Sequence, residues 1–571
     1  MNSYVLSALK ECIPQYINQK SAVSVSSFED YHYQLPLFFQ IKDTASQEAV
    51  IQSILAHPAF VKAAKTGPGF LSLKLNLDYF IEKLKEPLSA SAQTVVIDYC
   101  GVNVAKQMHI GHIRSMFIGD YIANSHLAAG DSCILQNHIG DWGTQFGYLL
   151  GYLMQNSVKV EDNKHLTEVY KLAYAKYQED ADFKTFADGV SLALSTKVPG
   201  VVQLWEELVG LSMKEAQKFF ALFNLNMTAQ DTCGESFYAD MVEGVVEELI
   251  SQGIAVKSEG AVVVFFDEKE KLSPLILQKS TGAYLYAAYD LAAIQYRVKQ
   301  FNPNKIVYVV DKRQALHFQQ VFSIAKKAGW TNGVELQHVG FGTILGENKK
   351  PIKTREGRSL YLDELMQQGL DQYQATQHYQ SLVTAGLQEY GLDKKSVIGA
   401  LKYYDLHLSA AEDYVFDWKH VLNTQGNSAP YLQNAFVRID SILQKSGSNA
   451  LANMPYDAKI FDLNDFKSHL QSLSFGVKDL NDAGVALVFN TMLLSDVICS
   501  QSHTYASNKL CSALIDVAKA FHSFYEAAKV IGAENQEQLE IVLAYVGVNL
   551  FAGMKMLGIE PYPCVQNLKL G

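Results

Sequence analysis

Arginine, cysteine and proline are all scarce in this chain of 571 residues. The 7 cysteines include no Cys-x-x-Cys pair, and their odd number argues against a disulfide framework or a zinc cluster. With 13 prolines and 37 glycines, the chain is neither collagen-like nor rich in linkers. Hydrophobic residues make up 48% and charged residues 19%, which is typical of a globular protein with several buried cores.

Long apolar runs are missing as well. No stretch of about 18 residues is both apolar and free of charge, which argues against a membrane span. The segment 1–20 carries charges every few positions and has no apolar core, so it is unlike a secretory signal. Together with the unpaired cysteines, these features predict a protein of the reducing cytoplasm.

The net charge is −11 at pH 7, which by itself argues against a nucleic-acid partner. Binding depends on local patches, however, so the charge of a whole chain of this size is a weak guide. Most of the positive charge is lysine. The arginines are Arg114, Arg297, Arg313, Arg355, Arg358 and Arg438.

Three domains are expected from the change of pattern along the chain. At roughly 150 residues per domain, the length alone predicts three to four. Residues 1–90 mix helical spacing with an alternating run at 70–77, which predicts a small α+β domain. Residues 421–571 repeat a 3.6-residue apolar spacing, which predicts an all-α bundle. A segment rich in proline, serine and alanine at 86–93 is expected to link the first two domains.

The middle part, residues 91–420, has the pattern of an α/β domain. The order strand, loop, helix, strand over 94–136 predicts the first half of a nucleotide-binding parallel sheet. Apolar alternation at 261–266 and 306–310 is expected to supply the second half of the same sheet. The segment around 150–230 is amphipathic throughout and too long for a simple crossover, so we predict a helical insertion there.

The tetrapeptide His109-Ile110-Gly111-His112 lies directly after the first strand, where a helix should begin. A helix N-terminus binds anions through free N–H groups, and imidazoles there can donate hydrogen bonds to phosphate oxygens. Gly111 would leave space for a planar base. A chance pair is one alternative; a zinc site is another, but it lacks a nearby third ligand. The strand before and the helix after favour a nucleotide.

The segment containing this tetrapeptide resembles the HIGH region of class I aminoacyl-tRNA synthetases, and specifically of arginyl-tRNA synthetases. Further stretches resemble the same family in order: 137–147 (NHIGDWGTQFG), 284–290 (YLYAAYD), 338–342 (HVGFG) and 352–357 (IKTREG). The similarity runs from about residue 25 to the C-terminus. The residues of the HIGH region are Val102, Asn103, Val104, Ala105, Lys106, Gln107, Met108, His109, Ile110, Gly111 and His112.

The resemblance implies an ATP site and a catalytic lysine. Class I enzymes usually carry a KMSKS loop, but its second lysine is replaced here by Thr354. In the family, enzymes with such a loop are thought to use the lysine before HIGH, which is Lys106. The implied catalytic residues are His109, His112, Lys106 and Lys353. The implied ATP-binding residues are His109, Gly111, His112, His338, Gly340 and Lys353.

The resemblance also implies a pocket for arginine, whose guanidinium calls for carboxylates that accept forked hydrogen bonds. Glu235 and Asp290 match the acidic residues of the family pocket. If 286–290 is helical, Tyr286 and Asp290 share one face. Each of these residues could instead be an ordinary surface or core residue, because spacing alone selects none of them. The implied arginine-binding residues are Asn103, Glu235, Tyr286, Asp290 and Gln314.

Two further regions resemble the tRNA-binding parts of the family. The N-terminal unit is similar to the domain that touches the outer corner of tRNA, and the aromatics of Tyr31-His32-Tyr33 could stack on a base or pack in the core. The C-terminal bundle is similar to the anticodon-binding domain, where 431–438 (YLQNAFVR) matches a family pattern except at Asn434. The two units are expected at opposite ends of the chain, with the catalytic domain between them.

The resemblance implies ligation of arginine to its cognate tRNA through an arginyl-adenylate, with ATP, L-arginine and the tRNA as substrates. Magnesium is expected to accompany ATP, and no dedicated metal-ligand set or prosthetic group is expected. Family precedent favours a monomer. Two alternatives are another enzyme of the HIGH superfamily and an inactive, tRNA-binding paralogue. The acids of the pocket argue against the first, and His109, His112 and Lys106 argue against the second.

Overall fold

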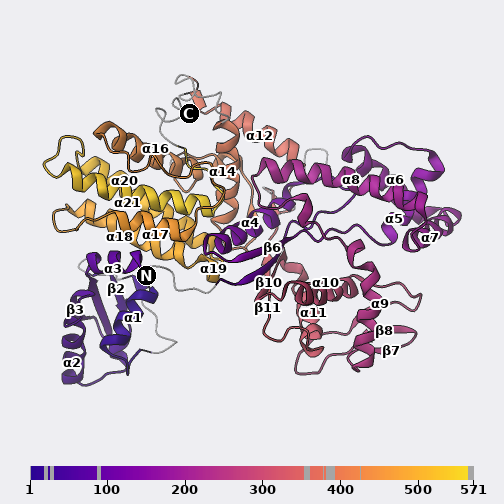
Figure 1. Cartoon of the computed structure of the whole chain (residues 1–571), viewed down its shortest axis with the longest axis horizontal. Helices are drawn as coiled ribbons and strands as arrows, with labels where there is room; N and C mark the ends of the chain where they lie inside the picture. The colour runs from indigo at the N-terminus through magenta and orange to yellow at the C-terminus, as the bar shows by residue number, and fades with distance from the viewer. Residues whose placement is uncertain are drawn as a thin grey trace.

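The protein is described here from a computed structural model, in which the central sheet lies between a helical lobe at 144–222, a mixed lobe at 235–301 and 315–327, and the C-terminal helices (Figure 1). The structure describes residues 2–17, 24–25, 31–86, 92–346, 348–350, 352, 360–376, 379–380, 383, 392–424 and 426–562.

Four parallel strands form the central sheet, in the order β11 (Glu335–Phe341), β10 (Lys305–Asp311), β5 (Thr94–Asp98) and β6 (Ser132–Gln136). The inner strands β5 and β10 are short apolar runs with almost no exposed surface, as expected for strands that are covered on both faces. Helix α4 (Ile113–Ala128) follows β5 and packs back onto the sheet. The predicted parallel sheet of nucleotide-binding type is confirmed.

One strand of the prediction is wrong. The segment at 261–266 does not join the parallel sheet; β8 (Ala261–Val264) pairs antiparallel with β7 (Val256–Ser258) and β9 (Leu275–Gln278) in a separate small sheet. The reason is the turn before it: Glu259 and Gly260 both have positive φ, at 50° and 80°. A two-residue turn of this type closes a hairpin, so β8 has to pair with the strand just before it.

The segment around 150–230 is helical, as predicted. Its helices form the lobe at the upper right of Figure 1, beside the carboxyl ends of the central strands. Helices α5 and α7 pack against each other, and α6 lies across both of them and α8. The helices are α5 (Thr144–Asn156), α6 (Asn163–Glu179), α7 (Ala181–Ser195) and α8 (Pro199–Leu222).

The N-terminal unit is α+β, as predicted, with an antiparallel sheet in the order β1-β2-β4-β3. Its strand β3 (Phe60–Thr66) follows helix α2 (Thr44–Leu55), which ends before Pro58. Tyr33 is buried in the core of the unit, so it is not available to stack on a base. The other elements are α1 (Asn2–Cys12), β1 (Ser24–Val25), β2 (Tyr33–Leu35), β4 (Phe70–Leu75) and α3 (Leu77–Lys85).

The C-terminal part is the predicted helical bundle. Helix α14 (Leu392–Leu406) lies between α4 of the catalytic part and the bundle helices α16 and α20. Two bundle helices, α18 and α21, are long and apolar enough to span a membrane by length and composition, but 89% of the apolar window of α21 is buried inside the protein. The bundle helices are α16 (Ala429–Ser446), α17 (Leu463–Ser472), α18 (Asp482–Cys499), α20 (Ser507–Ala527) and α21 (Gln536–Met556).

The N-terminal unit docks directly on this bundle. Helix α3 lies against α17 and α18 (Figure 1), and Lys85 Nζ donates a hydrogen bond to the carbonyl of Leu473 at 2.7 Å. The His32 ring stacks on Phe489 with 4.4 Å between centroids, so this ring also packs within the protein. The two units at opposite ends of the chain are therefore neighbours in space, and the catalytic part does not separate them.

Candidate active site

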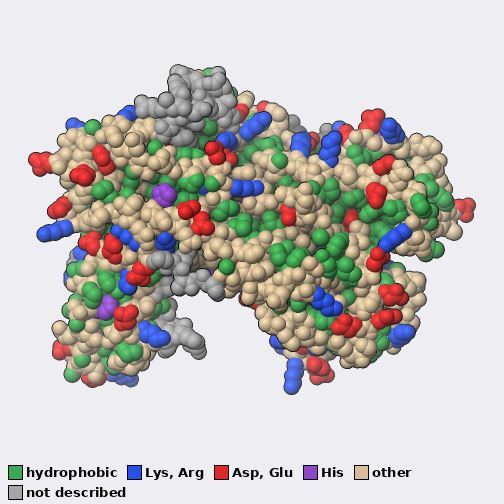
Figure 2. All heavy atoms as spheres, viewed as in Figure 1, with side chains coloured by type: hydrophobic (Ala, Val, Ile, Leu, Met, Phe, Trp, Pro, Cys, Tyr) green, Lys and Arg blue, Asp and Glu red, His purple; other side chains and the backbone are tan. Residues whose placement is uncertain are grey.

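A cleft of about 680 Å³ opens at the carboxyl ends of β5 and β10. In parallel sheets this edge is where ligands bind, because helix N-termini and loops converge there. On the face drawn in Figure 2, acidic and basic side chains are interspersed. The cleft is lined by these candidate residues: Asn103, Lys106, Glu235, Tyr286, Asp290 and Gln314.

The HIGH segment forms a tight turn beside the cleft. His109 Nδ1 accepts a hydrogen bond from the backbone N–H of Gly111 at 3.1 Å, which puts the ring proton on Nε2 and leaves that nitrogen as a donor. A Cβ at Gly111 would lie 2.9 Å from the His109 ring, so glycine is required for this contact. His112 lies over His109, with 4.2 Å between ring centroids.

Both HIGH imidazoles are neutral at physiological pH. Burial lowers the pKa of His112 to about 3, and the neighbouring His109 and Lys106 act in the same direction. Burial and the charge of Lys106 also lower the pKa of His109. A neutral imidazole with its proton on Nε2 can donate to a phosphate oxygen without itself carrying a charge that must be desolvated.

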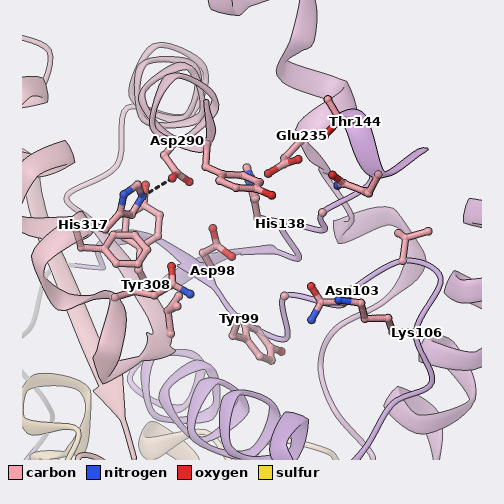
Figure 3. Close-up of a pocket in the computed structure, with 18 of the residues that line it drawn as sticks. Asp98, Tyr99, Asn103, Lys106, His138, Thr144, Glu235, Asp290, Tyr308 and His317 are labelled. Atoms are coloured by element: carbon pink, nitrogen blue, oxygen red, sulfur yellow. Dashed lines mark hydrogen bonds and ion pairs between the residues drawn. The ribbon is translucent and has the colours of Figure 1, made fainter. Parts of the chain in front are cut away.

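Two carboxylates form the acidic wall of the cleft. Figure 3 shows Glu235 and Asp290 on one side, with Asn103 and Lys106 opposite. Burial, together with the nearby charges of Asp290 and Asp141, raises the pKa of Glu235 to about 8. Asp290 Oδ2 lies 2.6 Å from Nε2 of His317. Two carboxyl groups that line one cleft, one buried and one half-buried, favour a positively charged ligand.

Glu235 is positioned by the first turn of α9 (Glu235–Ser251). The carboxylate of Asp141 accepts hydrogen bonds from the backbone N–H of Ser236 at 2.9 Å and from its hydroxyl at 2.5 Å. A Cβ at Gly234 would lie 2.4 Å from that carboxylate. The N–H of Glu235 donates to the carbonyl of Ile139 at 3.1 Å. The 137–147 stretch therefore serves to seat Glu235, a role that the sequence did not reveal.

A buried ion pair forms the floor. Arg297, in α10 (Tyr286–Phe301), approaches Asp98 with 2.8 Å between Nη1 and Oδ2, and its guanidinium lies over the ring of Tyr308 at 5.4 Å. Asp98 and Tyr308 both line the cleft. Because the pair is almost fully buried, it holds the floor in one arrangement.

A further wall of the cleft, which the sequence did not reveal, is lined by tyrosines of the helical insertion. Tyr170, Tyr174 and Tyr177 of α6 line the cleft together with Tyr148 of α5. Their spacing of four and seven residues places them near one face of a helix, and this is the signal that could have found them. Lys106 lies beside this wall, with its Nζ 5.3 Å from the centroid of the Tyr170 ring.

The candidate ATP residues at 338–340 lie outside the lining of the cleft but next to it. The His338 ring stacks on Phe318 with 4.7 Å between centroids, and Phe318 lines the cleft. Burial lowers the pKa of His338. A Cβ at Gly340 would lie 3.1 Å from the Cα of Lys312, so the backbone segments of these two residues pass close to each other. Lys353 and Thr354 lie outside the described residues.

Within the described ranges, no group of three or more histidine, cysteine, aspartate or glutamate side chains is arranged to hold a metal ion. The site thus combines neutral imidazoles, a lysine, two acidic residues and a helix N-terminus at one edge of a parallel sheet. Together these groups can hold an anion and a cation side by side.

This fold and site define a class I aminoacyl-tRNA synthetase. Residues 78–418 match the family model described as "tRNA synthetases class I (R), catalytic domain", and residues 432–563 match the "DALR anticodon binding domain". Among solved structures, the arginyl-tRNA synthetase from Plasmodium falciparum has a TM-score of 0.79 at 24% identity, covering 99% of this chain and 98% of that one. The Thermus thermophilus arginyl-tRNA synthetase has a TM-score of 0.75 at 17% identity, covering 99% and 100%.

The particular family follows from curated relatives. The protein named "Arginine--tRNA ligase" of Pseudomonas putida (strain GB-1) is 35% identical over 532 residues, covering 90% of this chain and 88% of that protein. The protein of the same name from Cellvibrio japonicus (strain Ueda107) is 35% identical over 519 residues, covering 89% and 86%. The chain belongs to the arginyl-tRNA synthetase family.

Proposed function

We propose that the protein ligates L-arginine to its cognate tRNA at the expense of ATP, for protein synthesis. The observation that carries this proposal is the acidic wall of buried Glu235 and half-buried Asp290 inside a nucleotide-type cleft. A guanidinium is planar and permanently charged, so it fits between carboxylates that can accept forked hydrogen bonds. A substrate without that cation would leave the buried Glu235 without a charged partner.

The arginine pocket is assigned to residues from separate elements of the fold. Asp290, oriented by His317, receives the guanidinium, and Tyr286 closes over it from one turn earlier on α10. Glu235 accepts from a positively charged group of the amino acid. Asn103 and Gln314 complete the pocket from the sheet edge. Each of these side chains lines the same cleft, which supports the assignment.

The ATP site is assigned to the HIGH turn and to the end of β11. His109 and His112 donate hydrogen bonds to the phosphates, and Gly111 lets the nucleotide approach the turn. His338 and Gly340 lie beside the adenine, and Lys353 reaches the phosphates from the loop after β12 (Ile344–Leu345). Magnesium arrives with ATP and is held mainly by phosphates and water.

The chemistry is two displacements. The carboxylate of arginine attacks the α-phosphorus of ATP; a phosphoanhydride bond breaks, and arginyl-adenylate and pyrophosphate form. The terminal ribose hydroxyl of the tRNA then attacks the activated carbonyl, and AMP leaves. Lys106 stabilises the negative charge that develops on the phosphates in the first step. The protein contributes mainly positioning and electrostatic stabilisation, with no covalent intermediate on a side chain.

The tRNA is assigned to the two units that flank the catalytic part in sequence. Residues 1–90 would bind its outer corner and 421–571 its anticodon, while 91–420 carry out catalysis. The match of 432–563 to an anticodon-binding family supports the second assignment. We further propose a monomer that acts in the cytoplasm, apart from the membrane, without a prosthetic group.

One assay tests the function against its alternatives: aminoacylation of bulk tRNA with each of the twenty amino acids. Arginine alone should be attached. Attachment of another amino acid would identify a different enzyme of the HIGH superfamily. Binding of tRNA without attachment of any amino acid would identify an inactive paralogue.

A further inference from the structure

The loop that carries Lys106 has an unusual backbone. Ala105, the residue just before it, is almost fully buried and has φ of +64°. For a residue with a Cβ, this left-handed conformation is unfavourable. It persists only where the surrounding structure holds it. The groups that hold it come from the helical insertion.

Three consecutive residues of the loop each have a backbone group that is hydrogen-bonded to a side chain of α6 or α8. The N–H of Ala105 donates to Ser212 Oγ at 3.0 Å. The carbonyl of Lys106 accepts from Asn163 Nδ2 at 3.2 Å. The N–H of Gln107 donates to Thr167 Oγ1 at 2.8 Å. The backbone on either side of Lys106 is thus tied to the insertion and not to its own sheet.

These side chains also bind one another. Ser212 Oγ donates to Asn163 Oδ1 at 3.0 Å, and Thr167 Oγ1 donates to the carbonyl of Asn163 at 2.8 Å. Asn163 Nδ2 also donates to the carboxylate of Glu215. Ser212, Asn163 and Thr167 are 1%, 6% and 8% exposed, so the network is shielded from water. A buried polar network whose members are all paired is rigid.

The same face of α6 also contacts the lysine side chain. Asn163, Thr167 and Tyr170 are spaced by four and three residues, so they project from one side of the helix. The Lys106 ammonium lies 5.3 Å from the centre of the Tyr170 ring, within the range of a cation–π contact. The Tyr170 hydroxyl accepts a hydrogen bond from that of Tyr148 at 2.6 Å, which fixes the ring.

We propose that Asn163, Thr167, Tyr170 and Ser212 are positioning residues that aim the Lys106 ammonium at the reacting phosphates. By positioning Lys106, the helical insertion therefore affects the kcat of the enzyme. This inference rests on the proposed role of Lys106. The arginine pocket should be affected little, because Asn103, in the same loop, is held separately by its bridge to Gly140.

A double-mutant cycle tests the proposal on the full-length enzyme. Ser212→Ala should lower kcat for aminoacylation about tenfold, as a small misplacement of a catalytic group does, with the KM for arginine changed less than about twofold. Lys106→Ala should lower kcat by roughly 10²–10³. If Ser212 acts through Lys106, adding Ser212→Ala to Lys106→Ala should cause no further loss.

The outcomes separate the inference from the proposed function. Full activity of Lys106→Ala would overturn the role of the lysine itself. A large loss in Lys106→Ala, with the effect of Ser212→Ala fully additive, would leave the lysine in place and overturn the positioning role. Thr167→Val, which keeps its shape but loses the acceptor for Gln107, should repeat the result. Ser125→Ala, which removes the same atom from a buried serine of α4, is the matched control and should keep wild-type kcat.

Tyr170 offers a second readout. Tyr170→Phe keeps the ring under the ammonium and should retain most of the kcat, while Tyr170→Leu removes the ring and should lower it. Both variants lose the hydroxyl, so the difference between them reports the ring alone. Equal kcat values for the two would overturn the ring contact as part of the positioning.

Discussion

Arg114 and Asp405 form an ion pair deep in the protein, with 3.0 Å between Nε and Oδ1 and exposures of 1% and 0%. Arg114 is in α4, directly after the HIGH turn, and Asp405 is in α14, which leads to the bundle. The same guanidinium donates to the carbonyls of Glu412 at 2.8 Å and Ala410 at 2.9 Å. Two residues after Glu412 in the chain, β13 (Tyr414–Val415) begins, and it pairs with β12. The pair and these hydrogen bonds therefore join the HIGH helix to α14 and to the segment before β13.

The first prediction concerns this pair. Asp405→Ala should lower the free energy of unfolding by about 3–5 kcal/mol, because it leaves the Arg114 charge buried without its partner. Asp405→Asn keeps the shape and one acceptor and should cost less. Urea denaturation followed by circular dichroism measures both. A loss below about 1 kcal/mol for Asp405→Ala would show that the pair is not structurally important.

The second prediction follows from Glu235, whose pKa burial raises to about 8. Below that pH the free site holds a proton that a bound cation must expel. The affinity for arginine should therefore rise by about tenfold per pH unit up to about pH 8 and then level off. Calorimetry in two buffers of different ionisation enthalpy should detect release of a proton at neutral pH. Binding without proton release would contradict the assignment.

The raised pKa of Glu235 also makes the free energy of unfolding depend on pH. Between about pH 4.5 and about pH 8 the folded protein holds a proton on Glu235 that the unfolded chain has released. The contribution of this group to stability should therefore decrease as the pH rises through that window. In Glu235→Gln this part of the pH dependence should be absent, and the variant is the control for the measurement.

The third prediction concerns the HIGH imidazoles. His109→Ala and His112→Ala each remove a donor to the charge that develops on the phosphates, so the rate of adenylate formation should fall by about 10²–10³. Pulsed ATP–pyrophosphate exchange with tRNA present measures this step. The free energy of unfolding should change far less. Wild-type adenylate formation in both variants would rule out the phosphate role.

The fourth prediction concerns specificity. Asp290→Ala should weaken the use of arginine much more than that of ATP, because it removes a partner of the guanidinium. Canavanine, which keeps a planar guanidine group, should compete with arginine better than lysine does. The comparison of KM values for arginine and ATP checks this. Equal losses for both substrates would move Asp290 out of the amino acid pocket.

The fifth prediction couples tRNA to activation. The loop after β12 carries Thr354 in place of the usual second lysine, so the phosphate site is expected to be incomplete without tRNA. Binding of tRNA to the N-terminal unit and bundle can reach the HIGH helix through Arg114 and α14, provided tRNA prefers the competent state. ATP–pyrophosphate exchange should occur with intact cognate tRNA and be absent without it or with tRNA oxidised at its 3′ end.

Salt supplies a control for this coupling. Contacts to the tRNA phosphates weaken steeply as the salt concentration rises. The rate of tRNA-dependent exchange should therefore fall as salt is added. Robust exchange in the absence of any tRNA would contradict the coupling while leaving the identity of the substrate amino acid unaffected.

The local sequence pattern was sufficient to predict many of the helices and strands of the catalytic part. An apolar run at 94–99 followed by His109-Ile110-Gly111-His112 predicts a buried strand and a helix N-terminus, because both signals depend on neighbours in the chain. Asn103, Lys106, Glu235, Tyr286, Asp290 and Gln314 were assigned from the family resemblance alone, and all of them line one cleft. What each of them does there remains a prediction.

Other features depend on which segments meet in space, and periodicity does not carry that information. Alternation at 261–264 indicates a strand, but only the turn at Glu259 and Gly260 decides that its partner is β7. The sequence does not decide whether Tyr33 stacks on a base or packs in the core. The structure shows that it is buried in its own domain. Helix α3 meets the bundle about 400 residues further along the chain.

The sequence by itself determined the class of fold and the order of its parts, and its resemblance to a known family indicated the candidate site residues. Only the tertiary structure decided that Asp290 is paired with His317, that Asp141 seats Glu235, and that the insertion holds the loop of Lys106. The physical reason is range. A helix or strand is specified by residues a few positions apart, whereas a hydrogen bond between Ala105 and Ser212 exists only once distant segments have packed.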